Sequence, residues 1–212
     1  SKQQKMTLAE KYRPVSFKDV KGQDFATERI INFIKNFPQN SGAENNIGKK
    51  AIILFGPAGT GKTTLAHVAA KELNAELLEI NSSDLRNREE LEKIILPASE
   101  QKPLFSHSKI ILIDEVDGIS KVDEGGLSAL IEIVKSTAFP IIMTANDIWD
   151  KKFAELRRNA EVVPVKQLDY RAIFSILKEI CIKENARVSD EDILRISIKA
   201  SGDVRAAIND IE

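Results

Sequence analysis

A glycine-rich loop in the stretch LFGPAGTGKTTLA, residues 54–66, has the residue types and spacing of a phosphate site. Gly56, Gly61, Lys62 and Thr63 fit the pattern G-x-x-x-x-G-K-[ST]. In this pattern the loop N–H groups surround a chain of phosphates, the lysine reaches the β and γ phosphates, and the hydroxyl is a ligand for Mg²⁺. A chance glycine turn before a buried helix is the weaker alternative, because a strand-like run precedes the loop and a helical pattern follows it. The residues predicted to contact a nucleotide's phosphates here are Gly56, Pro57, Ala58, Gly59, Thr60, Gly61, Lys62, Thr63 and Thr64.

An acidic pair follows the apolar run KIILI, residues 109–113. Asp114 and Glu115 would then lie at the carboxyl end of a buried strand, where open parallel sheets bind their ligands. Asp114 suits a carboxylate beside Mg²⁺, and Glu115 is placed to accept a proton from an attacking water. A solvated acidic turn is the alternative, and it loses ground because a phosphate loop precedes this strand.

A third strand-like run, IIMTAND at residues 141–147, ends in the polar pair Thr144 and Asn146. Asn146 would orient a water molecule against the γ-phosphate, although a plain turn in which the Asn side chain bonds to its own backbone explains the residue equally well. With the loop and the acidic pair, this residue predicts Mg²⁺-dependent hydrolysis of a terminal phosphate.

Short apolar runs alternate with helical patterns through most of the chain. This alternation predicts an α/β fold, in which a five-stranded parallel sheet is covered by helices on both faces. From Asp169 onward the pattern is helical only, with a capping Asp or Ser at the start of each helix. We therefore expect a nucleotide-binding domain over residues 1–166 and a small all-α lid over residues 167–212. Helices are predicted over residues 23–37 and from Lys62, Asp84, Glu124 and Lys151; residues 38–50 are predicted as a loop.

The composition narrows the class of protein. A formal net charge of −1 provides no general attraction to nucleic acid or membranes, so contact with a polyanion requires a local patch. The single cysteine, Cys181, lies in an apolar pattern and is predicted to be a core thiol. His67 and His107 lack companion ligands for a metal. Because no apolar run approaches the length of a membrane span, we expect a soluble, cytoplasmic protein.

Several longer sequence motifs resemble those of the AAA+ branch of the P-loop ATPases, and within it the large subunit of archaeal replication factor C, the clamp loader. These motifs are EKYRPVSFKDVKGQ, NSSDLR, IDEVDGIS, TANDIWD and GDVRAAIND, and the resemblance runs from about residue 8 to residue 212. It implies that Asn146 is the sensor 1 residue and that Arg205 is the sensor 2 arginine of the lid. It also implies that the adenine and ribose are bordered by Tyr12, Arg13, Pro14, Val20 and Gln23.

The resemblance further implies partners: clamp-loader small subunits, a sliding clamp and primer–template DNA. Candidate DNA contacts are Ser83, Arg86, Arg88 and Lys121, although an ion-paired, solvated helix face accounts for the arginines about as well. Leu104 and Phe105 are candidates for the segment that enters the clamp, against the alternative of a buried loop anchor.

Two departures from the family pattern affect the expected role. Leu8 stands where the family has an aromatic residue, and AELRRNAEVV replaces the serine-arginine-cysteine word of the small subunits. Neither Arg157 nor Arg158 is therefore assigned as an arginine finger, and we expect this subunit to receive an arginine rather than to donate one. Both ends look cut, so we expect a fragment that lacks the collar domain and is monomeric on its own. A branch-migration motor, a helicase loader and a nucleotide-gated binding module with little hydrolysis are the alternatives.

Overall fold

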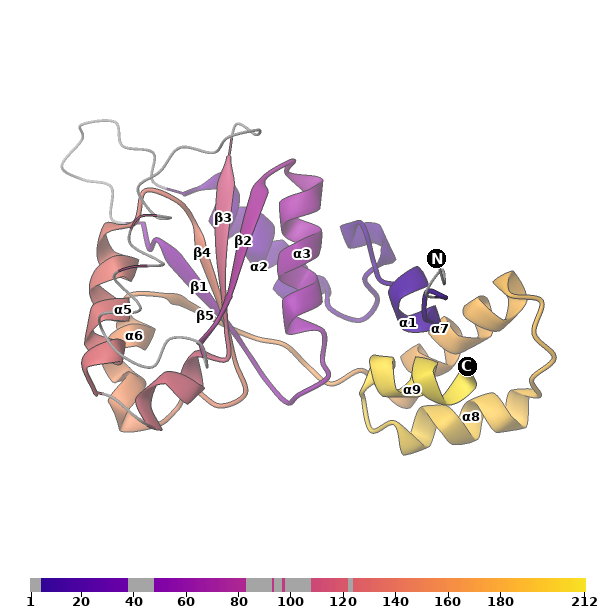
Figure 1. Ribbon diagram of the computed structural model, residues 1–212. Helices are drawn as coiled ribbons and strands as arrows, with labels where there is room; N and C mark the ends of the chain where they lie inside the picture. Colours follow the sequence, from indigo (N-terminus) through magenta and orange to yellow (C-terminus); the bar gives the residue numbers. More distant parts are fainter. Residues whose placement is uncertain (1–4, 38–47, 83–92, 94–96, 98–107, 122–123) are drawn as a thin grey trace.

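The computed structural model describes residues 5–37, 48–82, 93, 97, 108–121 and 124–212. Its centre is one sheet of parallel strands in the order β2-β3-β4-β1-β5 (Figure 1). The five-stranded parallel sheet predicted from the apolar runs is thus confirmed. The strands are β1 (Ala51–Phe55), β2 (Glu76–Asn81), β3 (Lys109–Asp114), β4 (Ile141–Ala145) and β5 (Glu161–Pro164).

Helices cover both faces of the sheet, because the buried strands alternate their side chains between two apolar layers. On β3, Ile110 and Leu112 pack with α2 (Asp24–Lys35) and α3 (Lys62–Glu72). Ile111 and Ile113, on the opposite face, pack with α5 (Glu124–Ser136) and α6 (Ala154–Arg158). Figure 1 shows the two helical layers on either side of the strands. Short 3₁₀ helices precede α2, α5 and α6: η1 (Phe17–Asp19), η3 (Val116–Lys121) and η4 (Lys151–Phe153).

The lid is formed by α7 (Tyr170–Lys183), α8 (Asp190–Lys199) and α9 (Val204–Ile211). Asp169, Ser189 and Asp203 each cap the following helix by accepting a backbone N–H bond, as the sequence predicts. Cys181 is buried in the lid core, and this burial raises the pKa of its thiol. The expected core thiol is thus confirmed.

A short N-terminal helix, α1 (Leu8–Lys11), was not predicted from the sequence and packs on the lid rather than on the sheet. Thr7 and Glu10 form a capping box that starts it. Leu8 contributes to the lid core. Figure 1 shows α1 beside α7 and α9.

Some predicted features lie outside the described residues. They are the helix from Asp84, most of the loop over residues 38–50, the DNA candidates Ser83, Arg86 and Arg88, and the clamp candidates Leu104 and Phe105. The side chain of Lys121 lies outside them as well, although its backbone ends η3. In the part of the chain that is described, no helix has the length and apolar character that crossing a membrane requires.

Candidate nucleotide site at the carboxyl ends of the strands

The phosphate loop connects β1 to α3, as the sequence pattern requires. Gly61 is the N-cap of α3 and has φ 88°, a left-handed backbone that favours glycine. A Cβ placed on Gly61 would meet nothing within 4 Å, so the loop opens onto free space at this point. No side chain caps the helix, and its N-terminal N–H groups and dipole therefore face the position expected for an anion.

Lys62 is buried, with 8% of its surface exposed, and its ammonium group points back into the loop. Its Nζ donates hydrogen bonds to the carbonyl oxygens of Gly56 and Pro57, the latter at 2.8 Å, and to Asn146 Oδ1 at 3.2 Å. Burial lowers the pKa of Lys62, and the negative charges of Asp117, Asp114 and Glu115 oppose that shift. A buried cation in this position attracts an anionic ligand strongly.

The carboxylate of Asp114 lies beside the loop at the end of β3. Its Oδ1 accepts hydrogen bonds from the hydroxyls of Thr63 at 2.9 Å and Thr144 at 2.8 Å. Thr63 follows Lys62 on α3, whereas Thr144 is on β4, so three elements meet at this carboxylate. A hydroxyl next to a carboxylate is a hard oxygen donor set of the kind that Mg²⁺ prefers.

Glu115 follows directly and has a backbone φ of 57°, which is uncommon for a residue other than glycine, asparagine or aspartate. The conformation is held from three directions. Its N–H donates to Thr144 Oγ1 at 3.0 Å, and its carbonyl oxygen accepts bonds from the Ser82 hydroxyl and from the Gly118 N–H. The side chain is exposed at the cavity and is available to act on a solvent molecule there.

Asn146, the residue expected to sense the γ-phosphate, lies at the end of β4 and contacts Lys62. Its backbone N–H and that of Asp147 both donate to Asp117 Oδ2, at 3.1 and 3.3 Å. The turn after β3 therefore fixes the turn after β4. The structure brings Lys62, Asp114 and Asn146 to one rim of the sheet, as the sequence pattern predicts.

These groups open into a cavity of about 840 Å³ between the sheet domain and the lid. That volume lies within the range of pockets that bury small organic ligands. Gln23 closes part of it, since its buried side chain donates from Nε2 to the carbonyl oxygen of Lys166 at 2.6 Å. Apolar side chains from the lid form one wall, among them Leu168, Ile176, Val204 and Ile208. The cavity is also lined by all of the residues expected to border adenine, ribose and γ-phosphate: Tyr12, Arg13, Pro14, Val20, Gln23 and Arg205.

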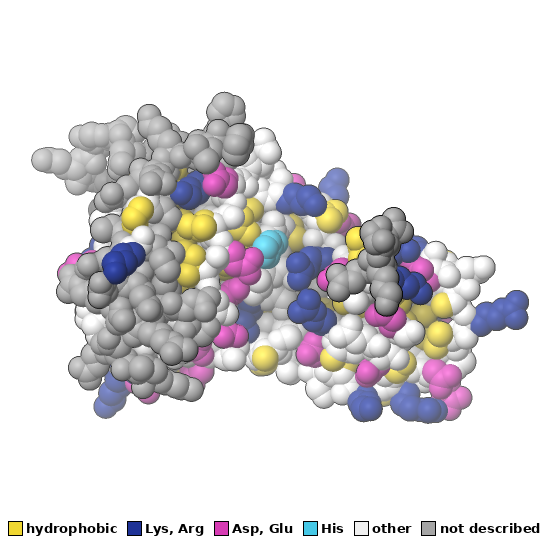
Figure 2. Space-filling model, in the orientation of Figure 1, with side chains coloured by type: hydrophobic (Ala, Val, Ile, Leu, Met, Phe, Trp, Pro, Cys, Tyr) yellow, Lys and Arg dark blue, Asp and Glu magenta, His cyan; other side chains and the backbone are white. Residues whose placement is uncertain are grey.

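Basic side chains surround the mouth of this cavity, and Figure 2 shows Lys and Arg side chains gathered where the two lobes meet. Two acidic side chains of the lid, Glu179 and Glu184, form ion pairs with two of these lysines. Glu184 pairs with Lys11 and accepts a hydrogen bond from the Tyr12 hydroxyl, and Glu179 pairs with Lys21 at 2.6 Å. The N-terminal segment is thereby tied to α7 along one side of the cavity.

The arrangement suits a nucleoside triphosphate with a divalent cation. Gly61 leaves open space where a phosphate chain would lie, the helix terminus and Lys62 provide positive charge, and Thr63 and Asp114 provide oxygen ligands. The apolar wall under the lid is suitable for a base. No cluster of three or more His, Cys, Asp or Glu side chains able to hold a metal by itself is found among the described residues. Thr63 and Asp114 would hold a divalent cation together with phosphate oxygens of the nucleotide.

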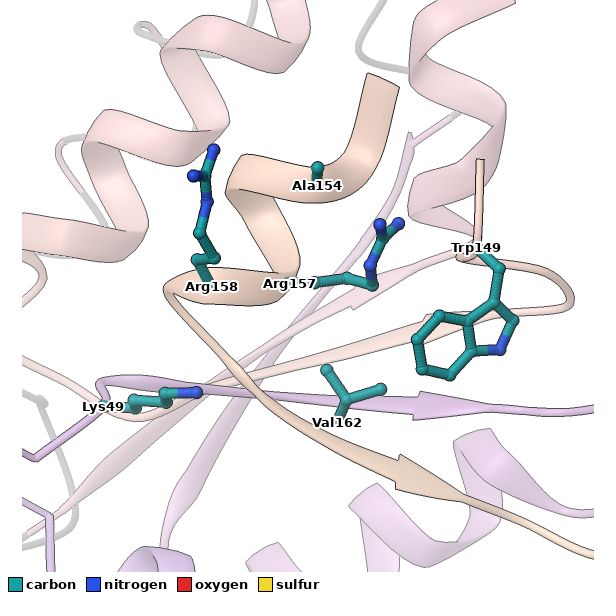
Figure 3. A pocket seen from close by; sticks show the side chains of 6 residues that line it. All are labelled: Lys49, Trp149, Ala154, Arg157, Arg158 and Val162. Carbon is teal, nitrogen blue, oxygen red and sulfur yellow. The ribbon is translucent and has the colours of Figure 1, made fainter. Parts of the chain in front are cut away.

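A second, smaller pocket of about 520 Å³ lies beside β5 and α6, and Figure 3 shows the side chains that line it. Arg157 extends toward Trp149 there. Its guanidinium stacks 5.3 Å from the Trp149 ring and donates to the carbonyl oxygens of Ile148 and Asp150, the latter at 2.8 Å. Arg158 is exposed and points away from Arg157. In this structure the Arg157 side chain therefore binds the loop between β4 and α6.

Three residues of the site were given no role from the sequence. Thr144 and Ser82 fix the Glu115 backbone, and Asp117 fixes that of Asn146. A signal existed for Thr144, because a hydroxyl near the end of an apolar strand requires a hydrogen-bond partner when buried. Ser82 and Asp117 stand in polar turns, where the pattern gives no such signal.

Comparisons with known proteins agree with this geometry. The family model for the ATPase family associated with various cellular activities (AAA) matches residues 52–166, and the RCF1/5-like, AAA+ ATPase lid domain matches residues 175–212. The chain is 43% identical over 213 residues to the replication factor C large subunit of Thermofilum pendens and 41% identical over 203 residues to that of Nanoarchaeum equitans. The alignments cover 100% and 95% of this chain but 50% and 46% of those proteins, so the chain spans about half the length of the curated relatives it matches.

The solved structure of the Thermotoga maritima RuvB Holliday junction branch migration motor superposes with a TM-score of 0.69 at 20% identity, over 93% of this chain and 63% of that one. This likeness supports the fold. The resemblance to replication factor C large subunits inferred from the sequence words is confirmed by the relatives. The chain belongs to the AAA family of ATPases.

Proposed function

We propose that this chain is the ATPase module of a DNA sliding-clamp loader large subunit. In this proposal, ATP binding holds the loader in the state that opens the clamp, and hydrolysis releases the closed clamp on primer–template DNA. The observation that carries the proposal is the similarity to replication factor C large subunits along the whole chain, together with the phosphate-site residues at one rim of the sheet. ATP and Mg²⁺ are the ligands whose chemistry this rim fits best.

Each polar group of the rim has a distinct task in hydrolysis. Lys62 and Arg205 supply positive charge where negative charge develops on the leaving phosphates. Glu115 accepts a proton from the attacking water, and Asn146 orients that water. Thr63 and Asp114 hold Mg²⁺, which neutralises phosphate charge when bound. The N–H groups of residues 58–64 would hold the phosphates, since these residues line the cavity, whereas the Gly56 N–H donates to the Ala145 carbonyl oxygen and Pro57 has no N–H.

The lid and the N-terminal segment provide the nucleotide with its other wall. Arg205 stands in the first turn of α9 and lines the cavity, so closure of the lid would bring its charge toward the phosphates. The proposed boundary between the two units lies at 166/167, and α1, although it stands in the first unit along the chain, packs against the lid core. Contacts between the lid and the nucleotide would couple the nucleotide state to subunit geometry.

The expected partners are small subunits, a sliding clamp and primed DNA, in the cytoplasm of an archaeal cell. We propose that a neighbouring subunit supplies an arginine to this site, and that Arg157, which donates to backbone carbonyl oxygens of its own loop in this structure, does not act as a finger. Ser83, Arg86, Arg88 and Lys121 remain the proposed DNA contacts, and Leu104 and Phe105 the proposed clamp contacts.

The experiment that tests this function is a clamp-loading assay. Full-length protein is assembled with its small subunits, and the transfer of labelled clamp onto primed circular DNA is measured together with ATP turnover. The proposal predicts that clamp and primed DNA together stimulate ATPase activity and that loading needs ATP. Turnover that is indifferent to both clamp and DNA, with no clamp on the DNA, would instead favour a different AAA motor. ATP-dependent loading that does not change when Glu115 is replaced by Gln would favour a nucleotide-gated binding module at this site.

A further inference from the structure

We infer that Thr144 is a positioning residue for hydrolysis at this site, and the inference rests on the proposed function. Thr144 is the next-to-last residue of β4, with 2% of its surface exposed. In the sheet β4 lies between β1, which leads into the phosphate loop, and β3, which carries the acidic pair. Thr144 pairs with Leu54 in the strand register. Its side chain thus stands at the centre of the rim.

The Thr144 hydroxyl both donates and accepts a hydrogen bond. It donates to Asp114 Oδ1 at 2.8 Å and accepts from the Glu115 N–H at 3.0 Å. The two acidic residues expected to act in hydrolysis are therefore fixed by one side chain, one through its carboxylate and the other through its backbone. A hydroxyl has one proton and two lone pairs, so the two bonds are compatible.

The contact with Glu115 has a mechanical consequence. The backbone of Glu115 is held at φ 57°, a conformation that a residue with a side chain keeps only when its surroundings enforce it. Ser82 and Gly118 hold the carbonyl side of Glu115, and its N–H donates to the Thr144 hydroxyl. Removal of the hydroxyl would free the N-terminal side of Glu115 and take from Asp114 Oδ1 one of its two hydrogen bonds within the described residues, leaving the bond from Thr63.

Substitution of Thr144 tests the inference in the assembled complex. Thr144→Val keeps the shape and removes the hydroxyl, whereas Thr144→Ser keeps the hydroxyl. We expect Thr144→Val to lower the kcat for ATP by about 10- to 100-fold, since small misplacements of catalytic groups have effects of this size. ATP affinity measured without Mg²⁺ should stay within about threefold. More Mg²⁺ should be required for half-maximal turnover, and Thr144→Ser should restore most of the activity.

Thr137→Val is the matched control. Thr137 is also buried, with 1% of its surface exposed, and its hydroxyl also makes two hydrogen bonds, both with the Phe139 backbone. It precedes the amino end of β4, whereas Thr144 lies near the carboxyl end of that strand. Its loss should lower the melting temperature and leave kcat within about twofold. If Thr144→Val does not fold, Thr144→Ala is compared with Thr144→Ser in the same way.

A kcat for Thr144→Val within twofold of the wild-type value would overturn the inference, and so would an equal loss in Thr144→Ser. A wild-type complex without ATPase activity would overturn the proposed function, and the inference with it. The two failures are distinguishable because the first occurs in a complex whose wild-type form is active.

Discussion

The ammonium group of Lys62 lies 3.2 Å from the amide oxygen of Asn146, although 84 positions separate the two residues in the chain. One residue starts α3 after the phosphate loop, and the other follows β4. Their contact joins the part of the site expected to bind the phosphates to the part expected to sense them. A γ-phosphate that attracts Lys62 would change this contact, so the pair provides a direct route from ligand to sensor.

Replacement of Lys62 by Ala should weaken ATP binding at least about tenfold, because a charge-assisted hydrogen bond to phosphate is lost in a buried place. The measurement is titration of a fluorescent ATP analogue. Lys71→Ala is a matched control, since Lys71 is an exposed lysine in the last turn of the same helix. Equal affinity in the Lys62 and Lys71 variants would contradict the assignment of the loop.

Substitution of Gly59 by Ala should disturb the contact between the phosphate loop and the lid. Gly59 has φ 77°, and an added Cβ would come within 2.6 Å of Asp203 Oδ2. Asp203 caps α9 through its Oδ1, so moving it weakens the start of that helix. We expect unfolding to become easier by about 1–3 kcal/mol, from the left-handed backbone and the lost cap together.

Urea denaturation measures this effect. Gly118→Ala serves as its control, because the added Cβ would lie at an ordinary 3.6 Å from Ser82 Oγ. An unchanged denaturation midpoint in the Gly59 variant would show that the loop and Asp203 are not in contact in solution.

Arg157 and Arg158 are neighbours in sequence and should behave differently on substitution. Arg157→Ala removes a cation–π contact and two hydrogen bonds to carbonyl oxygens, so we expect a loss of about 1–2 kcal/mol in stability. Arg158→Ala, at an exposed position, should change stability by less than about 0.5 kcal/mol. Thermal unfolding of both variants checks this order. Equal effects would mean that Arg157 is free in solution and open to a role toward a neighbouring subunit.

Acid should weaken the link between the N-terminal segment and the lid. Hydrogen bonds from Lys21 and then Lys183 lower the pKa of Glu179 from its usual 4.5 to about 2. A depressed folded-state pKa stabilises the protein above pH 4.5, and this contribution is lost as the pH falls from 4.5 toward 2. The stability difference between wild type and Glu179→Gln should therefore be largest near pH 6 and shrink by pH 3.

The pH series is measured by urea unfolding of both proteins, and 1 M NaCl should shrink the difference at pH 6 because the pairs are exposed. A difference that stays constant from pH 6 to pH 3 would rule out an ionic origin.

The sheet and the three polar strand ends could be predicted because they depend on local patterns. Buried parallel strands give short apolar runs, and the chemistry follows directly after them at Gly56, Asp114 and Asn146. Parallel pairing then brings these ends to one rim. The roles of Arg205 and Tyr12 came only from the resemblance, because an exposed arginine and a tyrosine carry no signal by themselves.

The remaining features depend on contacts between distant segments. The helix α1 is four residues long and has no apolar period, although its capping box, Thr7 and Glu10, is visible in the sequence. The bond from the Tyr12 hydroxyl to Glu184 joins residues 172 positions apart, and nothing local to either one indicates it. The same holds for Asp117, whose carboxylate accepts from the N–H groups after β4.

We propose that Lys62, Asp114, Glu115 and Asn146 form one hydrolytic site for ATP. Single-turnover hydrolysis by the assembled complex with Glu115→Gln tests it most directly, with the exposed lid residue Glu191→Gln as the control. We predict that the Glu115 variant binds ATP within about threefold of wild type and hydrolyses it about 10²- to 10⁴-fold more slowly, as expected for loss of a general base. Unchanged hydrolysis at this site in the Glu115 variant would contradict the account.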